Sequence, residues 1–225
     1  MNTQALGSAL VIPVDKEHSA MRLTIVLIFI AIWIISFIVA SIVIPNEGLS
    51  LLAVLLGFGV AYALTALLER FLKTRWPSGR VVEIEREGVK LLKKGALQQE
   101  MRSEDPVDAR LWSFKISKRA RVPKGWSMLA CALEYENQFL TIYTFMSPSQ
   151  LETFELAEQF KKLASQRKGK SDADAREDLR VAGEQRRLRD AENHRWMFGA
   201  EMIPADFIAY ISRIKTQFPE WTFQN

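Results

Sequence analysis

Two uninterrupted apolar runs dominate the first third of the chain. They cover residues 23–44 and 49–68, and neither contains Asp, Glu, Lys, Arg or His. The hydrocarbon core of a bilayer is about 30 Å thick and needs about 20 apolar helical residues to cross it, a length that both runs reach. Only residues 45–48 separate the runs. The pattern therefore predicts a transmembrane helical hairpin that enters and leaves on the same face of the membrane.

Basic residues flank the outer ends of this hairpin, whereas its turn contains no Lys or Arg. Lysine and arginine near helix ends remain in the cytoplasm, so we expect a multi-pass protein of the cell inner (plasma) membrane with both termini cytoplasmic. A cytoplasmic segment then precedes the hairpin at residues 1–22. The flanking basic residues are Lys16, Arg22, Arg70, Lys73, Arg75 and Arg80.

Small side chains recur every four residues along the second apolar run. Ala53, Gly57 and Ala61 form one stripe of a helix, and such stripes let helix backbones approach closely in a membrane. Two interpretations stay open: the stripe packs the two helices on each other, or it contacts another subunit. Neither run has an Asp, Glu, Lys, Arg or His side chain, so a pump or a coupled transporter is not expected.

From residue 77 the apolar positions alternate with polar ones, which is typical of half-buried strands. Such runs occur near residues 81–85, 89–91, 112–116, 127–136 and 138–146, and residues 95–110 have room for a sixth strand. Ser147, Pro148 and Gln150 then form a helix-start signal, and the apolar spacing predicts an amphipathic helix that extends to Leu163. Antiparallel strands that end in one helix over the open end of the sheet indicate an α+β fold.

The run 79–92, Trp112 with Phe114, the long hairpin 127–146 and the segment 147–154 resemble bacterial pleckstrin-homology-like domains. Such domains are often tethered behind a two-helix membrane anchor, as in the YcxB-like proteins. The resemblance covers residues 70–165 plus the apolar hairpin. It implies an antiparallel β-sandwich or barrel at residues 77–165, capped by a C-terminal helix. That fold has seven strands, of which the alternation locates five and residues 95–110 can supply one more.

Residues 166–225 have no counterpart in such a domain, and we expect them to form a charged helical C-terminal extension. Mixed charges at close spacing between residues 171 and 196 suit an exposed helix. A short amphipathic helix starts at Pro204 and places Phe207, Ile211 and Ile214 on one side. This second helix either folds back on the domain or offers its apolar face to a partner.

One basic cluster is the candidate contact site for lipid or for a partner. Lys118, Arg119, Arg121 and Lys124 fall in a segment without acidic residues that joins two predicted strands. Each basic residue near an anionic leaflet contributes about 1 kcal/mol of binding. The alternative is an ordinary solvated loop in a protein of net charge +4. No base-stacking aromatic array accompanies the charge, so nucleic acid is not an expected partner.

The sequence contains no motif for catalysis, a cofactor or a metal. His18 and His194 are far apart in polar segments, and no glycine-rich phosphate loop follows a strand. Cys131 alternates with apolar neighbours, which predicts a buried structural thiol. We expect a non-catalytic membrane protein that docks protein partners, a further copy of itself or anionic lipid headgroups. The alternatives are an accessory or assembly subunit of a larger membrane complex, and a membrane-tethered enzyme whose site the sequence hides.

Overall fold

The computed structural model describes residues 9–15, 19–43, 51–117, 122–164 and 177–224. The chain forms two compact units, one of residues Asp15–Ser78 and one of Met1–Val14 together with Gly79–Asn225. The second unit thus joins parts of three regions that the sequence analysis placed apart, the N-terminal segment, the domain and the C-terminal extension. The reason is that strands and helices from all three regions contribute to one pair of sheets and their core.

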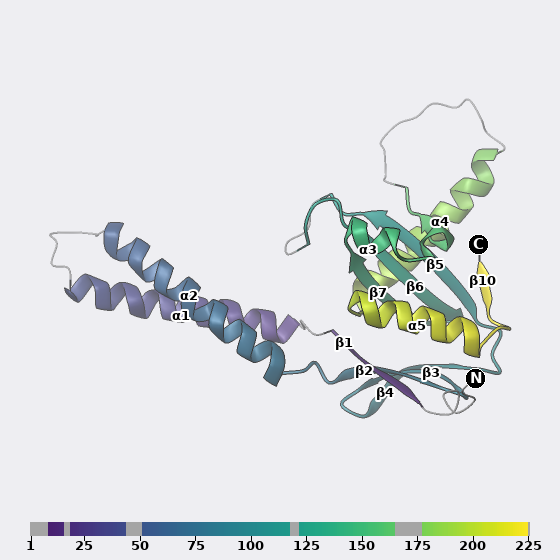
Figure 1. Cartoon of the computed structure of the whole chain (residues 1–225), viewed down its shortest axis with the longest axis horizontal. Helices are drawn as coiled ribbons and strands as arrows, with labels where there is room; N and C mark the ends of the chain where they lie inside the picture. Colours follow the sequence, from purple (N-terminus) through teal and green to yellow (C-terminus); the bar gives the residue numbers. More distant parts are fainter. Residues whose placement is uncertain (1–8, 16–18, 44–50, 118–121, 165–176, 225) are drawn as a thin grey trace. The chain divides into compact units, whose positions relative to one another are not determined.

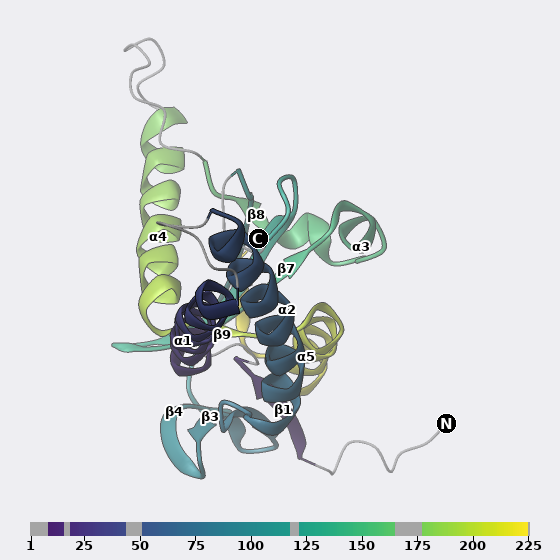
Figure 2. The same ribbon diagram turned by 90° about the vertical axis from the view of Figure 1, so that its left-hand side faces the viewer.

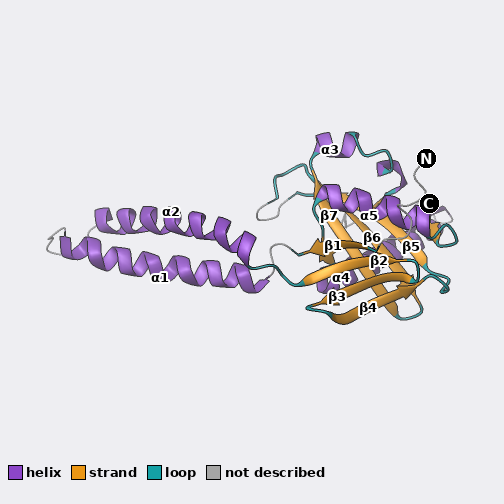
Figure 3. Ribbon diagram, turned by 60° about the horizontal axis from the view of Figure 1, so that its bottom comes forward, coloured by secondary structure: helices purple, strands orange, loops and turns teal. Residues whose placement is uncertain are grey.

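Two long helices, α1 (Ser19–Val43) and α2 (Leu51–Arg75), pack against each other as a hairpin (Figures 1 and 3). This confirms the helical hairpin that the apolar runs predicted. Ala20–Val43 and Leu51–Leu72 are long and apolar enough to cross a membrane.

The small side chains of α2 lie where the two helices approach each other. Ala53, Gly57 and Ala61 are buried. A Cβ atom added at Gly57 would lie 3.0 Å from the backbone nitrogen of Phe37 in α1 and 3.3 Å from its Cα. The ring of Phe58 contacts Phe29 edge to face at a centroid distance of 5.4 Å. Gly57 therefore permits a close approach, since even a Cβ atom at this position requires α1 to shift by a few tenths of an ångström.

The first sheet of the other unit is fully antiparallel, with four strands in the order β1-β2-β3-β4. The predicted alternation located two of these strands, β2 and β3, and β4 lies within residues 95–110, where a sixth strand had room. The strands are β1 (Leu10–Val14), β2 (Arg80–Glu85), β3 (Gly88–Lys93) and β4 (Ala96–Arg102).

Strand β1 was not predicted, and it changes the architecture. Leu10 pairs with Ile84 and Val14 with Arg80, so β1 and β2 are antiparallel neighbours. The whole helical hairpin is therefore inserted in the connection between two adjacent strands of one sheet. Ile12 and Val14 point into the core while Val11 is exposed. Pro13 is tolerated because β1 is an edge strand.

The second sheet is mixed and has six strands, in the order β10-β5-β6-β7-β9, with β8 paired to β5. Its antiparallel centre is the predicted run of long strands, and three short strands add to it in parallel. Among the described strands none joins the two sheets, so they do not close into a barrel. The strands are β5 (Asp108–Lys115), β6 (Ser127–Tyr135), β7 (Gln138–Met146), β8 (Lys161–Lys162), β9 (Ala200–Glu201) and β10 (Thr222–Gln224).

The main core fills the space between the two sheets and is covered by helix α5 (Pro204–Gln217). Phe207, Tyr210, Ile211 and Ile214 of α5 are buried in the same cluster as the inward side chains of both sheets. Of the two alternatives for this amphipathic helix, the structure shows the one in which it folds back on the domain.

The predicted amphipathic helix over residues 148–163 is wrong beyond its first turn. Ser147 and Gln150 form the expected reciprocal cap, but helix α3 is only Pro148–Glu152. A short 3₁₀ turn, Ala157–Gln159, and strand β8 follow. Phe154 and Phe160 are both buried in the main core, yet six residues of α-helix would place them about 120° apart. An irregular chain lets both rings enter the core. The helix that covers the sheets is α5, not the predicted helix after Ser147.

The outer face of the second sheet is covered by helix α4 (Glu177–Phe198). Successive side chains of β6 alternate between the main core and a second cluster, in which Leu188 and Ala191 of α4 contact Trp112 and Met128. Figure 2 shows α4 and α5 on different sides of this sheet. The charge-dense helix is thus half buried, which corrects the expectation of an exposed one.

The close approach at Gly57 predicts a position-specific effect of helix bulk. Gly57→Leu forces the α1 backbone away and should destabilise the hairpin by about 1–3 kcal/mol, the range for overpacked sites. Gly59→Leu is the matched control, since a Cβ at Gly59 meets nothing within 4 Å. Thermal unfolding of the full chain in mild detergent should show a lower midpoint for Gly57→Leu alone. Equal midpoints for the two variants would contradict this packing.

Candidate functional site

A surface groove of about 590 Å³ lies in the sheet-containing unit between β4, the β6–β7 turn and the C-terminal half of α4. Its walls come from segments that are far apart in the chain, so the fold alone brings them together. Polar side chains predominate, and four of them are carboxamides. These four are Gln98, Gln99, Asn137 and Gln138.

Strand β4 forms one wall of the groove. It is the last strand of the first sheet, and no described strand pairs with its outer edge. Leu97 and Gln98 are exposed, whereas Met101 is buried and anchors the strand. The register to β3 shifts at Leu91 and Leu92, as at a β-bulge. The Oε1 atom of Gln99 is buried and has no hydrogen-bond partner among the described residues.

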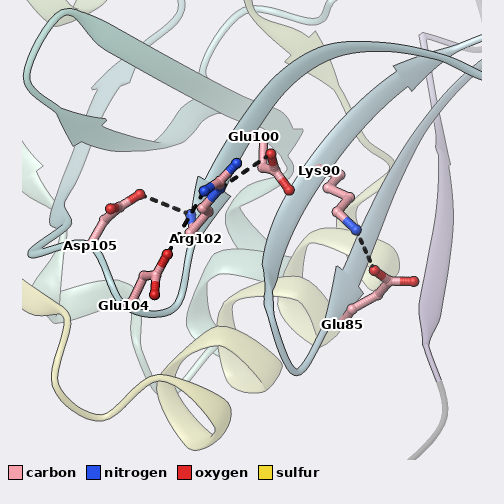
Figure 4. Close-up of polar contacts among 6 residues, drawn as sticks. All are labelled: Glu85, Lys90, Glu100, Arg102, Glu104 and Asp105. Carbon is pink, nitrogen blue, oxygen red and sulfur yellow. Dashed lines mark hydrogen bonds and ion pairs between the residues drawn. The ribbon is translucent and has the colours of Figure 1, made fainter.

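Charged side chains surround the end of β4, as Figure 4 shows. The Arg102 guanidinium lies 3.6 Å from Glu100 and 3.8 Å from Glu104, and the Arg102 backbone N–H donates to the Asp105 carboxylate at 3.3 Å. The Arg102 side chain is 61% exposed, so these contacts are weak in water. The guanidinium therefore stays accessible to a ligand.

A second ion pair in the same sheet is structural. Lys90 on β3 contacts Glu85 on β2 at 2.6 Å (Figure 4). The hydrogen bond to Glu85 raises the pKa of Lys90. Lys90 and Glu85 do not line the groove, so this pair ties neighbouring strands together rather than contributing to a site.

The rings of Tyr135, Phe139 and His194 form the opposite wall of the groove. The His194 ring stacks on Phe139 with a centroid distance of 4.3 Å and also contacts Phe198 at 5.2 Å. The negative charge of Glu136 raises the pKa of Tyr135, with further contributions from burial and from Asp105. The Tyr135 hydroxyl therefore remains protonated at neutral pH and can both donate and accept a hydrogen bond.

A buried polar network fixes the part of α4 that bears His194. Glu192 accepts hydrogen bonds from the indole N–H of Trp112 at 3.1 Å and from two nitrogens of Arg195 at 2.8 and 2.6 Å. Arg195 is only 3% exposed, and its guanidinium lies 4.6 Å from the centroid of the Tyr143 ring. Tyr143 in turn donates to Glu201 at 3.2 Å. The network links α4 to β5, β7 and β9.

The structure describes only one of the four predicted contact residues. Lys118, Arg119 and Arg121 fall outside the described residues. Lys124 is exposed in the connection from β5 to β6 and does not line the groove. Sequence reasoning missed the groove because its carboxamides are separated by about forty positions and look like ordinary surface residues. The buried network had one sequence signal, a strand tryptophan whose indole N–H requires an acceptor when buried.

The four carboxamides equip the groove for hydrogen bonding. They do not exchange protons near neutral pH and so do not act as acids or bases. Within the described part of the chain, no group of three His, Cys, Asp or Glu residues could hold a metal ion. The Cys131 thiol is buried in the main core, as expected, and its burial raises its pKa to about 12. It is therefore not a thiolate nucleophile at neutral pH.

The Glu192–Arg195 pair predicts a large cost for a one-atom change. Glu192→Gln leaves the buried Arg195 charge without its counterion, which should destabilise the domain by about 3–5 kcal/mol. The same change at Glu104, whose contact with Arg102 is exposed, should cost at most about 1 kcal/mol. Urea unfolding of the detergent-solubilised chain measures both changes. A Glu192→Gln variant as stable as Glu104→Gln would refute the structural role of the network.

No protein-family model, no curated protein and no solved structure matches the chain.

Proposed function

We propose that this chain is a non-catalytic, multi-pass protein of the cell inner membrane, with a pleckstrin-homology-like domain at the cytoplasmic face that docks a partner protein. The membrane location is supported by two helices of sufficient length. Their large side chains, such as Leu23, Ile42 and Leu51, are exposed along the hairpin. A hydrocarbon environment suits such a surface, whereas a soluble monomer rarely exposes contiguous apolar patches of this kind.

The connection through β1 and β2 supports the proposed topology. Val14 and Arg80 lie opposite each other in one sheet, so the chain must leave and re-enter the same domain on one side of a membrane. The positive charges at Arg70 and Arg75 favour the cytoplasm as that side. The number of crossings is then even, in agreement with two spans.

Support for a pleckstrin-homology-like domain comes from the order of its strands. β1 to β4 form one antiparallel sheet, β5 to β7 form the antiparallel centre of another, and α5 covers the core between them. β1 provides the strand that the alternation pattern had left unassigned. The departures from the proposed pattern are the hairpin inserted after β1 and the short strands β8, β9 and β10.

The groove beside β4 is the observation on which the docking proposal depends. An exposed strand edge can accept an extended peptide as an additional strand, and neighbouring pockets then select its side chains. Gln99, Asn137 and Gln138 offer both donors and acceptors to a peptide backbone, and Phe139 with His194 offers an apolar wall. The Oε1 atom of Gln98 already accepts from Arg80. We therefore propose an extended segment of a partner protein as the ligand.

Site-specific photocrosslinking in native membranes tests this proposal. A photoreactive phenylalanine at Leu97 should form an adduct of one discrete mass with a partner. Gln138→Trp adds bulk at an exposed position of the groove and should abolish this adduct. Thr216→Trp, at an exposed position of α5 outside the groove, should leave it unchanged. Absence of the adduct, or an adduct that persists with Gln138→Trp, would contradict peptide docking in the groove.

A further inference from the structure

The C-terminal end of α4 presents three consecutive apolar side chains to solvent. Trp196 is 73% exposed, Met197 70% and Phe198 54%. Single exposed apolar residues need no explanation, but contiguous ones mark interaction surfaces. Leu97 of β4 is a fourth exposed apolar residue near this group, since Arg80 donates hydrogen bonds both to the neighbouring Gln98 and to the Phe198 carbonyl, at 2.9 and 3.4 Å.

This apolar group lies at the end of the domain where both connections to the helical hairpin leave. Only residues 76–79 separate Arg80 from the end of α2 at Arg75. A fully extended residue spans at most about 3.6 Å, so Arg80 lies within about 18 Å of the end of α2 whatever the arrangement of the two units. Val14, opposite Arg80, is likewise separated from the start of α1 by only residues 15–18.

Basic side chains lie at the same end of the first sheet. Lys93 pairs with Arg80 in the register of β2 and β3, and the Lys94 backbone N–H donates to Gly79 at 2.6 Å. Lys93 and Lys94 are both exposed. Together with Arg80 they outnumber Asp15, the acidic residue next to Val14. Apolar and aromatic residues next to basic ones are typical of surfaces that lie in the interface of an anionic membrane.

We infer that Trp196, Met197 and Phe198, with Lys93 and Lys94, form a membrane-contact surface that lies on the anionic leaflet next to the hairpin. The inference rests on the proposed membrane anchorage but is independent of the ligand of the groove. The apolar side chains enter the headgroup region, and the lysines face lipid phosphates. Because the short connections keep this surface near the bilayer, even a weak contact is populated.

The contact would orient the groove. Leu97 of the groove lies beside the membrane-contact surface, and Phe198 contacts His194 of the opposite groove wall. A domain held by this surface therefore presents its groove at a fixed distance from the bilayer, where a segment of a neighbouring membrane protein is within reach.

Lipid-borne quenchers test the inference on the full chain in vesicles of phosphatidylcholine with phosphatidylglycerol. An environment-sensitive fluorophore is attached to single introduced cysteines, since Cys131 is buried and does not compete for the label. Met197→Cys reports the membrane-contact surface. Glu104→Cys, beyond the far end of β4, is the matched exposed control. Val60→Cys in α2 reports the anchor itself.

We expect shallow nitroxide lipids to quench most of the fluorescence at position 197 and little at position 104. Quenching at position 197 should weaken when phosphatidylglycerol is omitted, and equal quenching without it would overturn the anionic preference. Quenching at position 60 but not at position 197 would overturn the inference while leaving the anchorage intact. A label at position 197 that is shielded from aqueous iodide yet not reached by the lipid quenchers would show that protein covers the surface, which also overturns it.

Discussion

The pairing of β1 with β2 is the constraint on which the rest of the structure depends. The two strands are adjacent in one sheet, yet the whole helical hairpin lies between them in the chain. Closing so long a loop costs conformational entropy. The antiparallel packing of α1 on α2 returns the end of α2 to the level where α1 begins. The packed hairpin thus shortens the effective loop. The small residues that let α1 and α2 pack therefore contribute to the stability of the sheet that contains β1 and β2.

The C-terminal region is part of the domain because its helices cover both sheets. The two sheets enclose a core that neither covers alone, and α5 buries Phe207, Tyr210 and Ile211 in it. The outer face of the second sheet would remain apolar without α4, whose orientation is fixed by the hydrogen bond from Trp112 to Glu192 and by the contact of Arg195 with the Tyr143 ring. Because α4 also supplies His194, the groove exists only when the C-terminal region is folded. The groove is thus a product of the whole unit, not of one motif.

Features set by local periodicity were predictable from the sequence. The uncharged runs located α1 and α2, and the alternation around Val82, Val89 and Leu129 located β2, β3 and β6. Features set by distant contacts were not. β1 is too short and contains Pro13, and its strand character depends on pairing with β2, which lies beyond the hairpin. The apolar residues from Leu151 to Leu163 have the spacing of a broad helix face, but Phe154 and Phe160 reach one core from an irregular chain. The groove could not be foreseen, since Gln99 and Gln138 become neighbours only through the packing of two sheets.

A disulfide across β1 and β2 tests the inserted-hairpin architecture most directly. Val11 and Glu83 are opposite each other in the register, and directly paired Cα atoms lie about 4.5–5.5 Å apart, within the range of a disulfide. Val11→Cys with Glu83→Cys should therefore oxidise to an intramolecular bond and change the mobility of the full chain on a non-reducing gel. Val11→Cys with Glu85→Cys, a diagonal pair at about 7–8 Å, should oxidise poorly. Efficient bonding to position 85, or none to position 83, would contradict the account.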